Sequence, residues 1–286
     1  MPHCPHHPHR AHRAPHLVCL ALSRTSVALV ASMAATGAAI AADGQTSSSL
    51  LGDKTEVTVG AAAQVAPRYA GANRTRLQPV PVLVVQRGVL FLDTTRGVGV
   101  QFQTNWGLYG SQSMFYDLGR LQRDSDWRPG DRRLAGMGDV RRSLTTRSLL
   151  VQDLGHGLSA SIEAEFALRD GARRNRYRTG VEYEVLNAGR ERMTLDVDAL
   201  WGDRRYNQAY FGVTPAQAAS SRFAAFKTGG GLYAGSVAAT WEHRFDAHWT
   251  GSLELRGTHY VDNAAHSPVV ERRNPVSAAL AATYTY

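Results

Sequence analysis

The sequence has little cysteine, little lysine and no long apolar run in its main part. Its two cysteines, Cys4 and Cys19, lie among the first 41 residues, so the rest of the chain has no disulfide framework. Beyond residue 42, no stretch approaches the roughly 20 consecutive apolar residues that a membrane-spanning helix needs. Hydrophobic residues still make up 43% of the 286 residues, enough for a core. A helical membrane protein is excluded, whereas a β-barrel is not, because only every second barrel residue faces lipid.

Positive charge is carried almost entirely by arginine, since lysine occurs only at Lys54 and Lys227. The formal net charge of +8 raises nucleic acid as a partner. The arginines are scattered, however, and form no basic stripe with interleaved aromatic residues. We therefore expect no nucleic-acid partner.

Hydrophobic residues recur at every second position from Thr55 onward, which is typical of strands whose two faces meet different surroundings. The segments run to ten or more residues, longer than the roughly 5–6 usual in soluble sheets. A tilted membrane strand of about 9–11 residues fits them better. A soluble sandwich with one charged face remains open on this pattern alone.

Twelve segments are predicted as strands, and ten is the alternative because residues 89–95 and 112–123 carry the weakest pattern. The segments are 55–66, 77–86, 89–95, 97–108, 112–123, 139–150, 157–169, 176–186, 191–201, 231–244, 249–260 and 275–286. Short and long connections tend to alternate between them, and both ends of the set lie on the short-turn side. An even strand number with this alternation predicts an all-β, transmembrane antiparallel barrel of the outer membrane, in contact with lipid and lipopolysaccharide.

The first 41 residues have the features of an export signal. Arg24 precedes an apolar run, and Ala39 and Ala41 form a small-x-small cleavage site. The histidine-rich extreme N-terminus could be a metal-binding tract, but we favour an atypical extension of a discarded leader. We expect residues 1–41 to be a cleaved signal peptide, 42–54 a periplasmic segment and 55–286 the barrel.

Charged residues of both signs occupy the polar faces of the strands and are expected to line the lumen. They are Glu163, Glu165, Arg169, Arg178, Glu182, Glu184, Arg192, Asp196, Asp198, Glu254 and Arg256. If they pair and fill the lumen, the barrel is a rigid scaffold. If water stays between them, it is a narrow pore, since twelve strands enclose far less than the 16–18 of open porins.

Aromatic residues cluster at the predicted strand ends, where two interfacial girdles are expected. Phe245 and Trp249 flank one short turn, and Trp201 and Tyr260 end two strands at the long-loop side. The last strand carries Tyr284 and ends at Tyr286, which resembles the signal read by the barrel-assembly machinery.

The longest predicted loop, residues 202–230, carries Tyr206, Tyr210, Phe211 and Gly212. A loop of this length indicates a functional or plugging element. The aromatic side chains could fold into the lumen or anchor the loop at the membrane interface, and the sequence leaves both open.

Catalytic constellations are weak. Glu163 and Glu165 share a strand face about 7 Å apart, a spacing that chance gives in any charged lumen. His266 and Ser267 are adjacent, which rarely brings such side chains together. Without a nucleophile elbow or a zinc spacing, we expect no enzyme activity, no catalytic residue, no metal and no cofactor.

Several stretches resemble the MltA-interacting protein family, also called MipA/OmpV. They are the Val59-Gly60 to Pro67-x-Tyr69-x-Gly71 opening, Gln78–Pro81, Leu134–Val140, Tyr206–Val213 and Ser267–Val270. The resemblance implies a Gram-negative outer-membrane protein. It also implies a scaffold that joins a lytic transglycosylase to a penicillin-binding protein, with narrow-pore, adhesion or antibiotic-response roles as alternatives.

Overall fold

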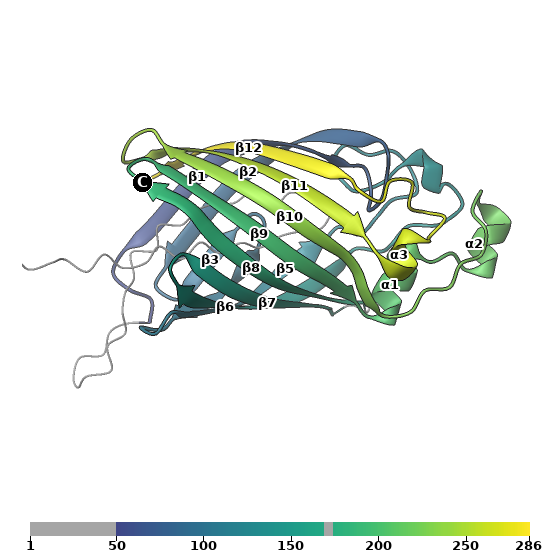
Figure 1. Cartoon of the computed structure of the whole chain (residues 1–286), viewed down its shortest axis with the longest axis horizontal. Coiled ribbons are helices and arrows are strands. Elements are labelled where there is room, and N and C mark those ends of the chain that lie inside the picture. The colour runs from purple at the N-terminus through teal and green to yellow at the C-terminus, as the bar shows by residue number, and fades with distance from the viewer. Residues whose placement is uncertain (1–49, 169–173) are drawn as a thin grey trace, which may run out of the picture.

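The computed structural model describes residues 50–168 and 174–286, which form a closed barrel of twelve antiparallel strands (Figure 1). Each strand pairs with its neighbours in the chain, and β1 pairs with β12 to close the wall. The predicted fold class is confirmed, with twelve strands and not ten. The predicted leader with Ala39 and Ala41 lies outside the described residues, as does Arg169.

The strands are β1 Thr55–Pro67, β2 Thr75–Arg87, β3 Leu90–Asp93, β4 Gly97–Gln103, β5 Leu108–Asp117, β6 Ser143–Gly155, β7 Leu158–Ala167, β8 Asn175–Ala188, β9 Glu191–Gly202, β10 Gly231–Arg244, β11 Trp249–Tyr260 and β12 Val276–Thr285. The helices are η1 Arg132–Leu134, α1 Arg204–Phe211, α2 Pro215–Ser220 and α3 Asp262–Ala265. Among the described residues, none of these helices combines the length and apolar character needed to traverse a bilayer.

The two ends of the barrel differ. Short turns, such as residues 189–190 and 245–248, lie at the end that holds the C-terminus (Figure 1). The longer connections 118–142, 203–230 and 261–275 lie at the opposite end, together with α1, α2 and α3. In outer-membrane barrels the short turns face the periplasm and the long loops face outward. We therefore refer to a periplasmic rim and an outer mouth.

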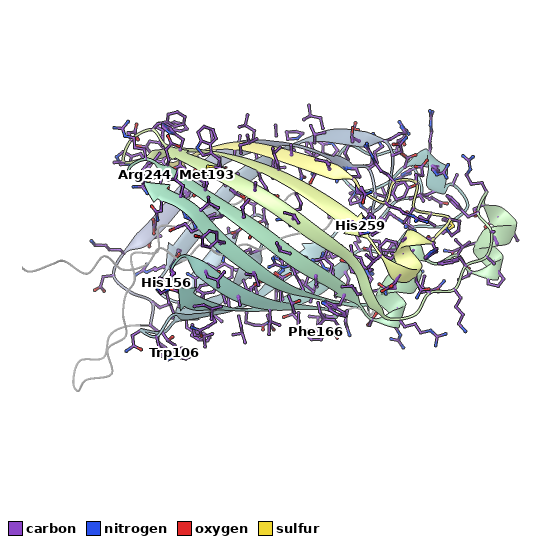
Figure 2. The ribbon with its side chains drawn as sticks, in the orientation of Figure 1. Trp106, His156, Phe166, Met193, Arg244 and His259 are labelled. Carbon is purple, nitrogen blue, oxygen red and sulfur yellow. The ribbon has the colours of Figure 1, made fainter. Side chains whose placement is uncertain are left out.

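The wall presents apolar side chains outward, and its inner face is largely polar, apart from buried apolar side chains such as the cluster beside β1, β2 and β12 that Ala62, Val80, Val82, Val84 and Ala281 form. On β9, Leu195 and Val197 are 43% and 58% exposed, whereas Asp196 between them is 4% exposed. Figure 2 shows side chains standing along the outside of the wall, among them the labelled Phe166 and Met193. An outward apolar band with a charged interior is the arrangement that lipid selects.

Several strand boundaries differ from the prediction, and β5 is Leu108–Asp117 and not 112–123, because residues 118–123 belong to the outer loop. β4 ends at Gln103 and not at residue 108, because residues 104–107 form a turn in which the Thr104 N–H donates to the Leu108 carbonyl (2.8 Å). β6 begins at Ser143 and not at 139, because the preceding residues belong to a folded loop. The next turn is centred on His156, and β6 continues to Gly155.

The β3–β4 hairpin is short, so one side of the wall is incomplete. β3 pairs only with residues 84–87 of β2, and among the described residues no strand pairs with residues 75–82 on that side. The Leu83 N–H donates to Thr94 Oγ1 (2.8 Å), so the odd-numbered residues of β2 direct their backbone groups toward this edge. Pro79 and Pro81 share that parity and carry no N–H. The two prolines therefore lie on an unpaired strand edge, where no neighbouring strand would accept a hydrogen bond from a backbone N–H.

Candidate functional site

The lumen beside β6 to β11 is occupied by a network of arginine–carboxylate pairs, which we call the lumen network. Its centre is Glu165 on β7, 3% exposed in its side chain. Glu165 accepts hydrogen bonds from Arg147 Nε (3.0 Å) and Nη2 (2.9 Å) on β6. It also accepts from Arg176 Nε (3.1 Å) and Nη2 (2.5 Å) on β8. One carboxylate thus ties three neighbouring strands together.

The network continues around the wall through Arg178 and Asp198. Arg178 donates to Glu163 (3.3 Å) on β7 and to Asp198 (3.2 Å) on β9. Asp198 also accepts from Arg256 (2.9 Å) on β11, and Arg256 donates to Glu254 (3.2 Å). All five side chains are less than a tenth exposed. Buried ions need such multiple partners, because desolvation would otherwise cost several kcal/mol for each.

A second group lies nearer the periplasmic rim. Arg192 on β9 pairs with Glu182 (3.3 Å) and Glu184 (2.7 Å) on β8 and with Glu242 (3.6 Å) on β10. Asp196 is buried on the same inner face, opposite Glu182 in the β8–β9 register. The side chains here are more exposed, at 14% for Arg192 and 21% for Glu184. Charge therefore lines this end as well, but with more access to water.

The structure places the described members of the predicted lumen set on the inner face of the wall. Sequence reasoning missed Arg147 and Arg176, which supply all four hydrogen bonds to Glu165 described above. The sequence contains a feature that could have identified each of these two arginines. Arg176 shares the parity of Arg178, and Arg147 lies opposite Glu165 in the β6–β7 register. The register could not be used, because the prediction ended β6 too early.

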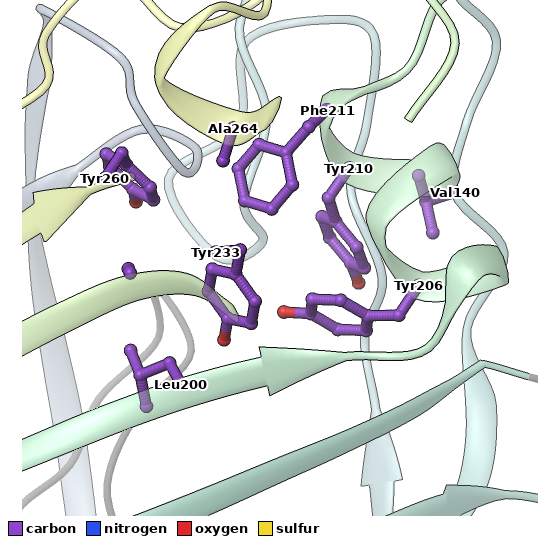
Figure 3. Packing of buried hydrophobic residues seen from close by; sticks show 9 residues of the cluster. Val140, Leu200, Tyr206, Tyr210, Phe211, Tyr233, Tyr260 and Ala264 are labelled. Carbon is purple, nitrogen blue, oxygen red and sulfur yellow. The ribbon is translucent and has the colours of Figure 1, made fainter. Parts of the chain in front are cut away.

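The outer mouth is closed by an aromatic cluster built on α1, which we call the mouth cluster (Figure 3). Asp203 caps the helix by accepting the Tyr206 N–H (2.6 Å), which fixes where α1 begins. The ring of Tyr206 lies 4.7 Å from that of Tyr210 and 5.4 Å from that of Tyr233 on β10. Phe211 packs against Tyr233 (5.4 Å) and Tyr260 (5.7 Å). The loop aromatics therefore fold inward.

Tyr260 was predicted for the outer girdle, and that prediction is wrong. It is 4% exposed and lies inside the mouth cluster, whereas Trp201, at 39%, faces outward. The alternation along β11 could have predicted this inward position, because Tyr260 is on the same strand face as Glu254 and Arg256. Gly212 follows α1 and donates its N–H to the Gln208 carbonyl (3.1 Å). A Cβ there would lie 2.7 Å from that carbonyl oxygen, so the glycine allows the close approach.

Two other loops fasten α1 in place. Arg120, 1% exposed, donates from Nη1 to the Tyr210 carbonyl (2.8 Å) and from Nη2 to the Ala209 carbonyl (3.2 Å). A cation at the carbonyl end of a helix is favourable there. Burial lowers the pKa of the Arg120 guanidinium from its ordinary value. From the third loop, Ser267 Oγ donates to the Phe211 carbonyl (2.5 Å).

A small space remains beneath the mouth cluster. The cavity measures about 80 Å³ and is lined by Tyr69, Tyr206, Tyr233, Glu254 and Arg256, among others. A volume of this size accommodates a few water molecules. This cavity is well below the roughly 300–1,000 Å³ of ordinary small-ligand sites.

The candidate catalytic pairs are not assembled. Glu163 and Glu165 are each held by arginines, and neither faces an open site. Ser267 donates to Phe211, whereas His266 Nδ1 contacts the Asp262 carbonyl (2.7 Å). In the described part of the chain, no three His, Cys, Asp or Glu side chains lie together as a metal site would require.

The periplasmic rim carries an aromatic band around the C-terminus. The ring of Tyr284 lies 4.8 Å from Tyr286, 5.3 Å from Trp249 and 5.2 Å from His248. The Tyr286 N–H donates to the Val57 carbonyl (2.9 Å), so the last residue is paired with the first strand while its side chain stays 74% exposed. Tyr286 is thus accessible at the seam that closes the barrel.

Comparison with known proteins gives one family and several distant structures. The family model described as MltA-interacting protein MipA matches residues 59–286. No curated protein matches the chain. The NanC porin is 10% identical with a TM-score of 0.40, and the match covers 80% of this chain and 98% of that one. The channel DcaP of Acinetobacter baumannii is 9% identical with a TM-score of 0.36, covering 82% and 96%. OprD from Pseudomonas aeruginosa is 8% identical with a TM-score of 0.32, covering 81% and 94%.

Proposed function

The chain belongs to the MltA-interacting protein MipA family, and from that premise we propose that it is a closed, non-enzymatic scaffold that holds murein-remodelling enzymes at the periplasmic rim. The barrel itself is an outer-membrane protein of a Gram-negative bacterium. Its family, its twelve-stranded closed wall and its outward apolar band agree on that location.

The observation that carries the proposal is the filled lumen. A conducting pore needs a continuous column of water along its axis. Here the lumen network fills the lumen beside six adjacent strands, and the mouth cluster covers its outer end. The ion pairs that link neighbouring strands hold the wall rigid, and their burial leaves little polar surface for a passing solute to bind.

The name of the family supplies the first candidate partner, a lytic transglycosylase. We add a penicillin-binding protein as the second, since a scaffold needs two clients. Their docking surface would be the periplasmic rim, because the long loops face outward. Exposed apolar side chains are present there: Leu50 is 68% exposed, Leu51 46% and Trp106, labelled in Figure 2, 62%. The Val89 N–H donates to the Leu50 carbonyl (3.0 Å), which holds this segment against the β2–β3 turn.

The test is binding of purified lytic transglycosylase to the barrel in lipid nanodiscs. A Leu51→Ser/Trp106→Ser variant should bind at least tenfold more weakly, because it removes two apolar contacts. Trp127→Ser is the matched control, since Trp127 is 68% exposed but lies in an outer loop. Its binding should equal that of the unmodified barrel. Absence of binding by the unmodified barrel, or steady solute-selective channels in a planar bilayer, would refute the scaffold.

A surface interaction role is the second candidate, and α2 favours it. Figure 1 shows α2 standing beyond the mouth at the outermost end of the molecule. A capping box between Thr214 and Gln217 holds this short helix in shape (2.9 and 3.2 Å). Replacing residues 214–222 by a short glycine-serine linker would leave α1 and the mouth cluster intact. Loss of binding to host cells in that variant, with transglycosylase binding unchanged, would support the adhesive role instead.

A further inference from the structure

A basin of about 600 Å³ opens at the outer mouth between α1, α2 and the loop of residues 118–142. It is separate from the lumen, because α1 lies between the two. Five arginines line it: Arg120, Arg141, Arg174, Arg204 and Arg205. They come from three segments that lie far apart in the sequence, so no single run of residues reveals the concentration of positive charge.

Two of the five arginines form the buried floor. Arg174, 4% exposed, pairs with Asp117 and donates to the Arg141 carbonyl (2.9 Å). Arg120 donates hydrogen bonds from its two terminal nitrogens to backbone carbonyls of α1, which are uncharged. Arg174 therefore has a carboxylate in direct contact, whereas Arg120 donates to uncharged carbonyls.

The other three arginines form an exposed rim. In the described part of the chain, the guanidinium groups of Arg141, Arg204 and Arg205 make no ion pair and no hydrogen bond. The lining contains a single carboxylate, Asp139, whose Oδ1 accepts the Gln122 N–H (2.9 Å). The contrast with the lumen is sharp, because there every described arginine of the network faces at least one carboxylate.

Like charges gathered around one cavity repel one another and raise its affinity for an anion. Guanidinium groups bind phosphate through two parallel hydrogen bonds, and a phosphate dianion balances two of them at one point. A volume of this size lies within the roughly 300–1,000 Å³ range of small-ligand sites. We propose that the basin binds a phosphate-bearing ligand, with Arg141, Arg204 and Arg205 as the phosphate ligands. The phosphate can belong to the headgroup of lipopolysaccharide or to a free sugar phosphate.

The experiment uses the full barrel in detergent micelles and measures binding by thermophoresis. The probes are glucose 6-phosphate with glucose as its uncharged control, and lipid A with dephosphorylated lipid A as its control. The test variant is Arg141→Gln/Arg204→Gln/Arg205→Gln, which changes only exposed side chains. Arg132→Gln is the matched control, because Arg132 is an exposed arginine of the same loop outside the basin.

We expect saturable binding of at least one phosphorylated probe and none of its control. The triple variant should lose at least tenfold in affinity, whereas Arg132→Gln should not change. Binding should also weaken when salt rises, since the rim is exposed to screening. Binding of glucose 6-phosphate assigns the site to free sugar phosphates, and binding of lipid A alone assigns it to lipopolysaccharide. No binding of either probe, or equal binding by the triple variant, overturns the proposal.

Discussion

Removing Glu165 tests whether the lumen is dry and closed. The Glu165→Leu substitution leaves no large cavity but deletes the acceptor of four hydrogen bonds from Arg147 and Arg176. At about 1.5–3 kcal/mol for a bond to a charged group, the four bonds give a gross loss of about 6–12 kcal/mol. Arg147 retains a weaker contact with Glu163 (3.8 Å), and water can enter the space. The net destabilisation should therefore be about 3–5 kcal/mol, as for breaking other buried pairs.

The assay is urea unfolding of the barrel in micelles, followed by the mobility of unboiled protein on a gel. Glu184→Leu is the matched control. Glu184 also binds an arginine, Arg192, but it is 21% exposed near the periplasmic rim, so its loss should cost at most about 1 kcal/mol. A Glu165→Leu/Arg176→Leu double variant should recover part of the stability, because it no longer buries that unpaired charge. Equal effects of Glu165→Leu and Glu184→Leu would mean a water-filled lumen and would refute the closed barrel.

Three further predictions concern the outer loops and the C-terminus. Arg120→Met should remove the two hydrogen bonds that hold the carbonyl end of α1, which lowers the free energy of unfolding by about 2–3 kcal/mol. Limited proteolysis between residues 203 and 230 should then be faster, and unchanged cleavage would contradict this role. Burial and the nearby Glu271 charge raise the pKa of Tyr69 above its usual value, so Tyr69 contributes stability that is full below pH about 10 and falls as pH rises further. Unfolding midpoints between pH 8 and 12 should show this alkaline loss in the unmodified barrel, and Tyr69→Phe should reduce it; parallel curves would contradict the assignment. If Tyr286 is part of an assembly signal, its deletion should lower the fraction of heat-modifiable barrel in the membrane; full assembly would exclude that role.

The strand pattern could be predicted because it depends on local alternation. Each of the twelve segments was found, since an inside–outside alternation is present in every one of them. The boundaries that failed, at residues 104–107 and at both ends of β5 and β6, depend on turns and loops stabilised by tertiary contacts. Ser143 begins β6 only because residues 118–142 fold into a separate loop.

The site was less predictable, because its contacts are distant in sequence. No neighbouring residue in the sequence indicates that Tyr206 and Phe211 fold inward. The hydrogen bond that holds their helix over the lumen comes from Arg120, about 90 residues away. The basin is hidden for the same reason, since its arginines lie on three separate segments. Parity alone, in contrast, would have placed Tyr260 inside, and its assignment to the girdle ignored that pattern.

The short β3–β4 hairpin gives the barrel an uneven hydrophobic height. On that flank β3 has four residues, whereas β8 on another side has 14, so the apolar band is much lower there. The missing part is toward the outer mouth, where the exposed Leu77 and the prolines of β2 meet the outer leaflet. Where the apolar band is lower than the hydrocarbon core is thick, the bilayer thins locally, at a cost of fractions of a kcal/mol per Å. We therefore expect the bilayer to be thinner beside β3 and β4 than around the rest of the barrel.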